Sequence, residues 1–352
     1  MKNLEIFSAG EAESACYCSP GVSASNGAVI VFCEARLGNG ADAGPHHLVY
    51  KRSADGGRSW GPLFYLEKAD GVCYMNPVPV YAKEKLFVVY ARADGDKRTQ
   101  VFARESVDEG KNWSEARELT HLFSADPRRR SYHLPGPGHG LQLKNGRIAI
   151  PFWHRHPLRP LDSLEGSAAA PLSKREYTVN VIYSDDGGQS WKAGAYARTW
   201  DDAGMAYCMN ECNIVQTPKE LVLLARTAQQ KGLPYRYRCA SRDGGESFGE
   251  PQPVEGLGCG VQCCSGLAAL ADDSYILTRP NSAAYPRRSL ELYASHDTSR
   301  WQRRILLEAG FSAYSDIAVH ADDGLLVVYN ATQYSNALGK TVRCVLLDRN
   351  EL

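Results

Sequence analysis

Glu211 is a candidate functional residue because of its surroundings. It lies in an apolar run typical of a buried strand, where an unpaired carboxylate carries a high desolvation cost. We therefore interpret Glu211 as a functional carboxylate. Tyr314 and Asp42 are less informative taken alone, because strand-end tyrosines and solvated loop aspartates commonly have structural roles.

The cysteines do not predict a metal site. There are 11 of them, an odd number, scattered along the chain, which favours reduced and mostly buried thiols over a disulfide framework. Two close groups, Cys208 with Cys212 and Cys259 with Cys263 and Cys264, have three-residue spacers and no adjacent histidine pair. Such groups are not typical zinc ligands. The sequence also lacks a phosphate-binding glycine loop, so we expect no metal and no cofactor.

The charge of the chain is balanced. Its 352 residues include 40 Lys and Arg against 40 Asp and Glu, with 43% apolar side chains. This composition predicts a globular protein and gives no electrostatic reason to expect a nucleic acid or an anionic membrane as the main partner. The sequence as it stands begins without a secretory signal and has no apolar stretch long enough to span a membrane. We expect a cytoplasmic protein, although a signal removed in processing would leave the same sequence.

A short motif recurs five times. Each copy has a Ser, an Asp two residues later and an aromatic residue at its end, and four of the five have one or two Gly after the Asp. Successive copies start 53 to 78 residues apart. Apolar runs that precede several copies predict strands, and the Asp-Gly-Gly segment predicts a hairpin turn from which the aromatic residue folds back onto its own sheet. The copies are Ser53–Trp60, Ser106–Trp113, Ser184–Trp191, Ser241–Phe248 and the degenerate Ser295–Trp301.

These spacings predict an array of repeated β units. The rest of the sequence also shows strands and turns with little helical periodicity, so we expect an all-β fold, a six-bladed β-propeller of four-stranded blades in one domain over 1–352. Five blades carry the turn motif. The sixth is expected to combine C-terminal strands with an N-terminal one. A Pro-, Ser- and Ala-rich insertion at about 155–177 is interpreted as a loop over the site or a partner contact.

Several segments, in order along almost the whole chain, resemble the sialidase (neuraminidase) superfamily, in which the recurring turn is the Asp box, also called the BNR repeat. Together they are more specific than the Asp box alone. They are Phe32–Arg36, Asp42–Gly44, Asn76–Pro77, Gly136–Leu143, Asn210–Cys212, Leu224–Arg226, Tyr285–Leu290 and Ser312–Asp316.

The resemblance implies three catalytic roles. A sialoside carries a carboxylate on its anomeric carbon, which repels an anionic nucleophile, so a phenol is a suitable attacking group. Tyr314 resembles that nucleophile and Glu211 the base that takes its proton. Asp42 resembles the acid/base that protonates the leaving group and later activates water. Family members of this kind retain the anomeric configuration through a tyrosyl glycoside.

The resemblance also implies an arginine triad that grips the substrate carboxylate. Arg226 and Arg287 resemble its second and third members, with Arg288 as the register alternative, and Arg36 resembles a further arginine of the pocket. Cys18 stands where the first triad arginine is expected, which removes a charge-assisted contact worth roughly 1.5 to 3 kcal/mol. If Cys18 faces the pocket, alkylation of its thiol should block activity. Candidate substitutes for the missing cation are Lys51, Arg52, Arg128, Arg129, Arg130, His133 and His139, and His139 is also a candidate to line the pocket.

The implied activity is that of a retaining exo-α-glycosidase that hydrolyses terminal sialic acid from glycoconjugates, with a glycan or sialoside as partner. Cys18 leaves open a related 2-keto-3-deoxy sugar acid, either a deaminated sialic acid or an eight-carbon analogue. A transferase would use the same residues. The alternative from another class is a noncatalytic glycan-binding propeller, which needs no base beside a phenol. Hydrogen-bonding distance between Glu211 and Tyr314 distinguishes the two classes.

Overall fold

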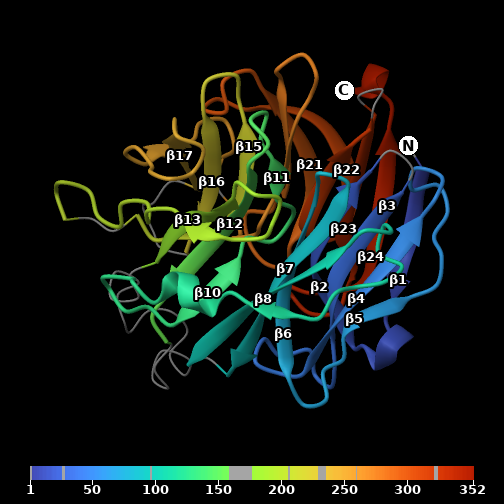
Figure 1. Cartoon of the computed structure of the whole chain (residues 1–352). Coiled ribbons are helices and arrows are strands. Elements are labelled where there is room, and N and C mark those ends of the chain that lie inside the picture. Colours follow the sequence, from blue (N-terminus) through green and yellow to red (C-terminus); the bar gives the residue numbers. More distant parts are fainter. Residues whose placement is uncertain are drawn as a thin grey trace.

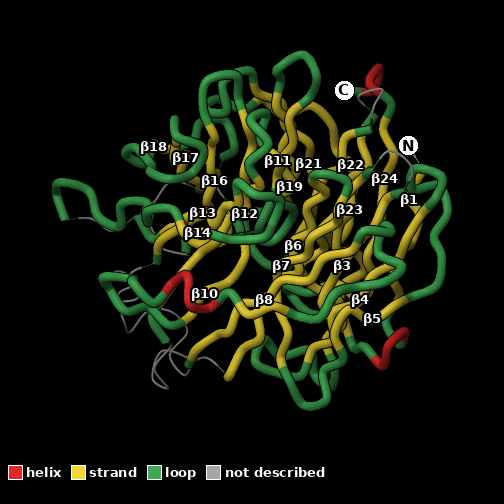
Figure 2. The backbone as a smooth tube through the Cα atoms, viewed as in Figure 1, coloured by secondary structure: helices red, strands yellow, loops and turns green. Residues whose placement is uncertain are grey.

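The computed structural model describes residues 2–25, 28–95, 97–157, 177–204, 207–228, 235–258, 260–320 and 324–352. Within these ranges the chain consists of strands and loops, with short 3-10 turns at Glu11–Glu13, Thr120–Phe123 and Arg349–Glu351 (Figure 2). In the described ranges no helix is long and apolar enough to cross a membrane. Most of the insertion predicted at about 155–177 lies outside the described residues.

The described strands form six blades, and consecutive strands within each blade pair antiparallel (Figure 1). The first two blades are β2 (Cys16–Ala24), β3 (Val29–Arg36), β4 (His46–Ser53) and β5 (Phe64–Glu67), then β6 (Cys73–Ala82), β7 (Lys85–Asp94), β8 (Arg98–Ser106) and β9 (Arg117–Glu118). The third and fourth are β10 (Tyr132–Pro135) with β11 (Leu141–Gln142), β12 (Ile148–Arg155), β13 (Thr178–Ser184) and β14 (Lys192–Ala193), then β15 (Met209–Gln216), β16 (Leu221–Thr227), β17 (Arg236–Ser241) and β18 (Gln252–Pro253).

The last two blades share one long strand. β19 (Gly266–Ala269), β20 (Tyr275–Pro280) and β21 (Arg288–Ser295) pair with the first half of β22 (Gln302–Val319), and its second half pairs with β23 (Leu325–Gln333) and β24 (Gly339–Leu347). The N-terminal strand β1 (Lys2–Ser8) completes the sixth blade by pairing with β24, so the two ends of the chain lie side by side (Figure 1). The six-bladed propeller predicted from the sequence is confirmed, including its closure by an N-terminal strand.

Side-chain hydrogen bonds hold the recurring turn in shape. In the first copy, Ser53 Oγ donates to Asp55 Oδ1 over 2.7 Å and accepts a hydrogen bond from the Gly57 amide over 2.8 Å. The amide of Ser59 donates to the same Asp55 oxygen over 2.8 Å. Gly57 has a φ of 89°, a left-handed conformation that glycine adopts at little cost. The matched Ser and Asp of each copy therefore satisfy the backbone of the hairpin.

The aromatic residue of the motif joins neighbouring blades, which corrects the prediction that it folds back onto its own sheet. Trp113 of the second blade packs edge-on against Phe32 and Tyr50 of the first, and its indole N–H donates to the Tyr50 hydroxyl over 3.1 Å. Trp191 of the third blade likewise packs edge-on against Phe87 of the second. The space between twisted sheets needs a large side chain, so the hydrophobic core lies between blades.

The loop between β10 and β11 packs tightly against β15. A Cβ placed on Gly136 would lie 2.0 Å from the carbonyl oxygen of Cys212, a distance at which backbone must move. Cys212 directly follows Glu211, so this contact between the third and fourth blades also fixes the strand that carries the candidate carboxylate.

We expect Gly136→Ala to destabilise the protein by about 2 kcal/mol or more, because the added methyl group overlaps backbone that cannot rotate away. Urea unfolding measures the change. Gly249→Ala is the matched control, since a Cβ there would lie 3.7 Å from the nearest atom, an ordinary contact. Equal stability of the two variants would contradict the close approach.

Candidate active site

A hydrogen bond joins two candidate residues that lie 103 positions apart in the sequence. The Tyr314 hydroxyl on β22 donates to Glu211 Oε1 on β15 over 2.7 Å. The residues come from the sixth and fourth blades, and only 9% and 7% of their surfaces are exposed. This distance lies within the hydrogen-bonding range required of a candidate general base and the group from which it takes a proton.

The surroundings keep the proton on Tyr314 and the charge on Glu211. Burial raises the pKa of the Tyr314 hydroxyl well above its ordinary value, and the Glu211 carboxylate raises it further. Burial would also raise the pKa of Glu211, but Arg226, whose Nε donates to Glu211 Oε2 over 2.6 Å, lowers it below its usual value. Tyr314 is therefore a neutral phenol at neutral pH, hydrogen-bonded to an ionised base.

Arg287 covers the face of Tyr314. Its guanidinium carbon lies 5.0 Å from the centre of the Tyr314 ring and acts to lower the pKa of that hydroxyl, partly offsetting burial. Two of its nitrogens donate to the carbonyl groups of Ala337 and Gln262, over 2.9 and 2.6 Å, while its buried Nε has no hydrogen-bond partner among the described residues. Arg288 is exposed, so the structure directs Arg287 inward and Arg288 to solvent.

Arg36 and Asp42 form a second group on the first blade. Arg36 is buried on β3 and pairs with Glu34, its Nε lying 2.9 Å from Glu34 Oε2. Another nitrogen of Arg36 pairs with Asp42 in the loop between β3 and β4. The Arg36 charge lowers the pKa of Asp42, and Arg287 acts in the same direction. The Asp42 side chain is 83% exposed, so it can meet a molecule that arrives from solvent.

Cys18 lies beside Tyr314 in a small buried cluster with Cys263, Cys264 and Ala313. Burial raises the pKa of the Cys18 thiol to about 12, so almost no reactive thiolate exists at neutral pH. Cys18 therefore lies beside Tyr314, and its burial makes the thiol a poor target for alkylation. The loss of activity on alkylation, expected if Cys18 faces the pocket, stays a prediction.

The proposed substitutes for the missing arginine lie elsewhere. They are held by other partners: Lys51 pairs with Glu11, Arg52 lies 3.9 Å from Glu109, Arg130 pairs with Asp126, and His133 hydrogen-bonds to His154. Arg128 and Arg129 are exposed in the loop that precedes Arg130.

His139 also lies apart from Tyr314 and Glu211. Its Nδ1–H donates to Asp316 over 2.8 Å, and its ring lines a cavity with residues near the distal ends of β2, β15 and β22. The structure does not bring His139 to the candidate active site.

Two charged residues near the site were not identified from the sequence. Glu34 is fully buried, holds Arg36 and accepts a hydrogen bond from the Asn76 amide over 2.9 Å. Arg236 is fully buried on β17, directly across from Arg226 on β16. Its Nε and Nη1 have no hydrogen-bond partner in the part of the chain that the structure describes. Strand alternation could have indicated Glu34, because residues two apart on a strand, here Glu34 and Arg36, face the same side of a sheet. The register of β16 and β17, which places Arg236, required the structure.

Comparisons with known proteins identify the family of the chain. A family profile described as "BNR repeat-like domain" matches residues 27–328. Human Sialidase-3 is 27% identical over 344 residues, covering 79% of this chain and 76% of that protein. The Exo-alpha-sialidase of Aspergillus fumigatus is 25% identical, covering 81% of this chain and 65% of that protein.

Solved structures show the same fold. The Hadza microbial sialidase Hz136 superimposes with a TM-score of 0.80 at 19% identity, over 99% of this chain and 69% of that one. The Trypanosoma rangeli sialidase gives 0.76 at 15% identity, over 99% and 60%. The repeats, the six blades and the matched profile lead to one conclusion: the chain belongs to the sialidase family with BNR repeats.

Proposed function

We propose that this protein is a retaining exo-α-glycosidase that hydrolyses terminal sialic acid from glycoconjugates. The observation that carries the proposal is the hydrogen bond from the Tyr314 hydroxyl to the ionised Glu211 carboxylate. A buried phenol beside a buried base has no evident use in a binding platform, whereas covalent catalysis at an anionic sugar requires that pair. The sialidase relatives support the same class of activity.

In the first step, Tyr314 Oη attacks the anomeric carbon while its proton passes to Glu211. Asp42 donates a proton to the glycosidic oxygen, so the aglycone leaves as a neutral alcohol. Because the pKa of Tyr314 is raised, attack by a free phenolate is not available at neutral pH, and proton transfer to Glu211 must accompany bond formation. The product of this step is a tyrosyl glycoside.

In the second step, water attacks the anomeric carbon and gives a proton to Asp42. Tyr314 departs and recovers its proton from Glu211, so the enzyme returns to its starting state with retained anomeric configuration. Arg287, whose guanidinium lies over the Tyr314 ring, and Arg226, beside Glu211, supply positive charge for the substrate carboxylate. Cys18 makes this carboxylate grip weaker than that of three arginines, so a deaminated or eight-carbon keto-deoxy sugar acid remains in the set of glycones to test.

Tyr314→Phe should abolish turnover of fluorogenic α-glycosides, because the nucleophilic oxygen is lost while the ring is kept. The panel contains sialic acid, its deaminated analogue, an eight-carbon keto-deoxy acid and neutral hexoses. We expect the native protein to cleave one keto-acid sugar. Tyr81→Phe, outside the candidate site, is the control and should retain activity. A folded native protein that cleaves no member of the panel would instead support a binding propeller.

Asp42→Asn should lower kcat/KM by about 10²–10⁴ for substrates with a sugar leaving group, and by much less for an aryl leaving group, which needs little protonation. Asp42 acts first as an acid. Arg36 lowers the pKa of the Asp42 carboxyl below its ordinary value, so kcat/KM for sugar leaving groups should fall as the pH rises through that lowered pKa. The asparagine variant should lose this limb of the pH profile. Equal losses on both leaving groups would refute the role, and Asp70→Asn serves as an exposed control.

Cys18→Arg should lower KM for sialosides about tenfold, because a guanidinium restores one charge-assisted contact to the carboxylate. Steady-state kinetics measure the change, and thermal unfolding checks that the larger side chain is accommodated. Cys18→Ser, which adds no charge, should leave KM within about twofold. A folded Cys18→Arg variant with unchanged KM would show that the substrate carboxylate does not approach this position.

A further inference from the structure

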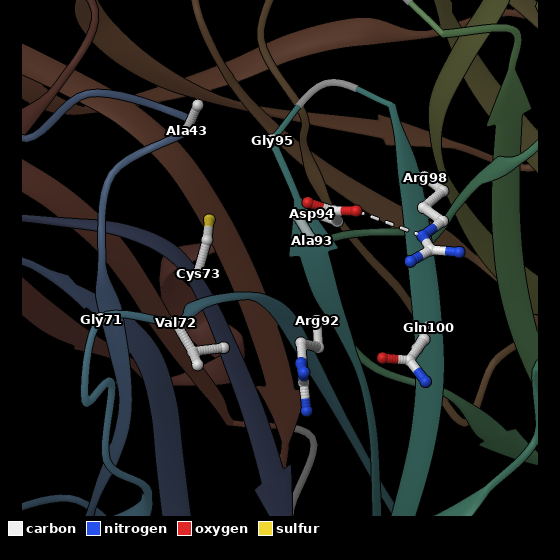
Figure 3. Close-up of a pocket in the computed structure, with 10 residues that line it drawn as sticks. All are labelled: Ala43, Gly71, Val72, Cys73, Arg92, Ala93, Asp94, Gly95, Arg98 and Gln100. Atoms are coloured by element: carbon white, nitrogen blue, oxygen red, sulfur yellow. Dashed lines mark hydrogen bonds and ion pairs between the residues drawn. The ribbon is translucent and has the colours of Figure 1, made fainter.

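A cavity of about 420 Å³ opens beside the loop that carries Asp42. Figure 3 shows that it lies between the chain entering β6 and the ends of β7 and β8 in the second blade. Its volume is within the range usual for small-ligand sites. Among the residues that line it are Ala43, Cys73, Arg92, Asp94, Arg98 and Gln100.

The cavity wall contacts the candidate acid/base directly. The Cys73 thiol donates to the backbone carbonyl of Asp42 over 3.4 Å, and Ala43, the next residue, lines the cavity. The backbone of the loop that carries Asp42 therefore forms part of the cavity wall. In a glycosidase the oxygen of the leaving sugar accepts a proton from the acid/base, so a leaving group bound at Asp42 would have this cavity as its neighbour.

The cavity presents positive charge. Arg98 pairs with Asp94 over 3.2 Å, and both side chains are mostly exposed, so an arriving anion can compete for Arg98 at little cost. Arg92 is also exposed and has no hydrogen bond or ion pair to the part of the chain that the structure describes. In Figure 3 the side chains of Arg92 and Gln100 lie side by side on adjacent strands, a cation beside an amide.

We propose that this cavity binds the leaving group of the substrate, and that it selects a sugar bearing an anionic substituent, either a sulfate ester or a carboxylate. The guanidinium of Arg92 matches the oxygen geometry of both substituents. Gln100 can hydrogen-bond to a sugar hydroxyl group. This inference rests on the proposed glycosidase function, because only a glycosidase has a leaving group at Asp42.

The test compares α-sialosides of one glycone on four leaving groups: 4-methylumbelliferone, galactose, galactose 6-sulfate and a second sialic acid. We expect kcat/KM for at least one anionic leaving group to exceed that for galactose about tenfold at low salt, and the preference to shrink as salt is added. A higher kcat/KM for the galactose 6-sulfate leaving group alone shows that the cavity selects a sulfate ester. A higher kcat/KM for the disialoside alone shows that it selects a carboxylate.

Arg92→Gln should reduce the ratio of anionic to galactose kcat/KM to near one, and Arg92→Lys should retain part of it. Arg242→Gln, at an exposed arginine in the turn of the fourth blade, is the matched control and should leave the ratio unchanged. Absence of a preference in the native protein, or a preference that survives Arg92→Gln, would overturn the proposal.

A failure of the glycosidase function itself is recognised separately. The methylumbelliferyl sialoside has a neutral leaving group and reports on the chemistry without needing the cavity. If it is not cleaved, the glycosidase proposal fails. Calorimetric titration of galactose 6-sulfate into native protein and Arg92→Gln then tests the cavity alone, and equal heats for the two proteins would show that it does not bind the anion.

Discussion

The buried hydrogen-bonded series of Tyr314, Glu211 and Arg226 is the constraint on which the site depends. A carboxylate at this depth is tolerated only because Arg226 balances its charge and the Tyr314 hydroxyl donates to it. The three groups come from two blades that do not adjoin in sequence, so they meet only when the propeller is closed. The same arrangement leaves Tyr314 as a neutral phenol whose hydroxyl donates its proton to the Glu211 carboxylate.

The fold brings these groups together through close contact of its inner strands. Gly136 lets the third blade approach the backbone of Cys212, next to Glu211, and the aromatic residues of the repeated turn fill the space between adjacent blades. Pairing of β1 with β24 closes the ring and positions β22, which carries Tyr314. Site geometry and propeller stability therefore depend on the same contacts.

The sequence predicted the features that depend on local pattern. The five repeated turns, together with their spacing and the length of the chain, predicted six blades, and the isolated carboxylate in an apolar strand indicated Glu211. The sequence could not predict which sheet the Trp113 side chain packs against. A turn motif determines the conformation of its own hairpin, but not the position of the neighbouring sheet. His139 and Arg236 show the same limit: which end of a strand a side chain reaches, and which residue it faces across the sheet, depend on register.

The central claim is that Tyr314 forms a covalent bond with the sugar, and trapping that adduct tests it most directly. A sialosyl fluoride with a second fluorine beside the anomeric carbon slows both steps, while the good leaving group favours the first, so the intermediate accumulates. Mass spectrometry of digested protein should find the added sugar on the peptide that contains Tyr314, at a yield that falls when Glu211 is replaced by Gln. Turnover of this reagent with the sugar attached to a different residue would contradict the account.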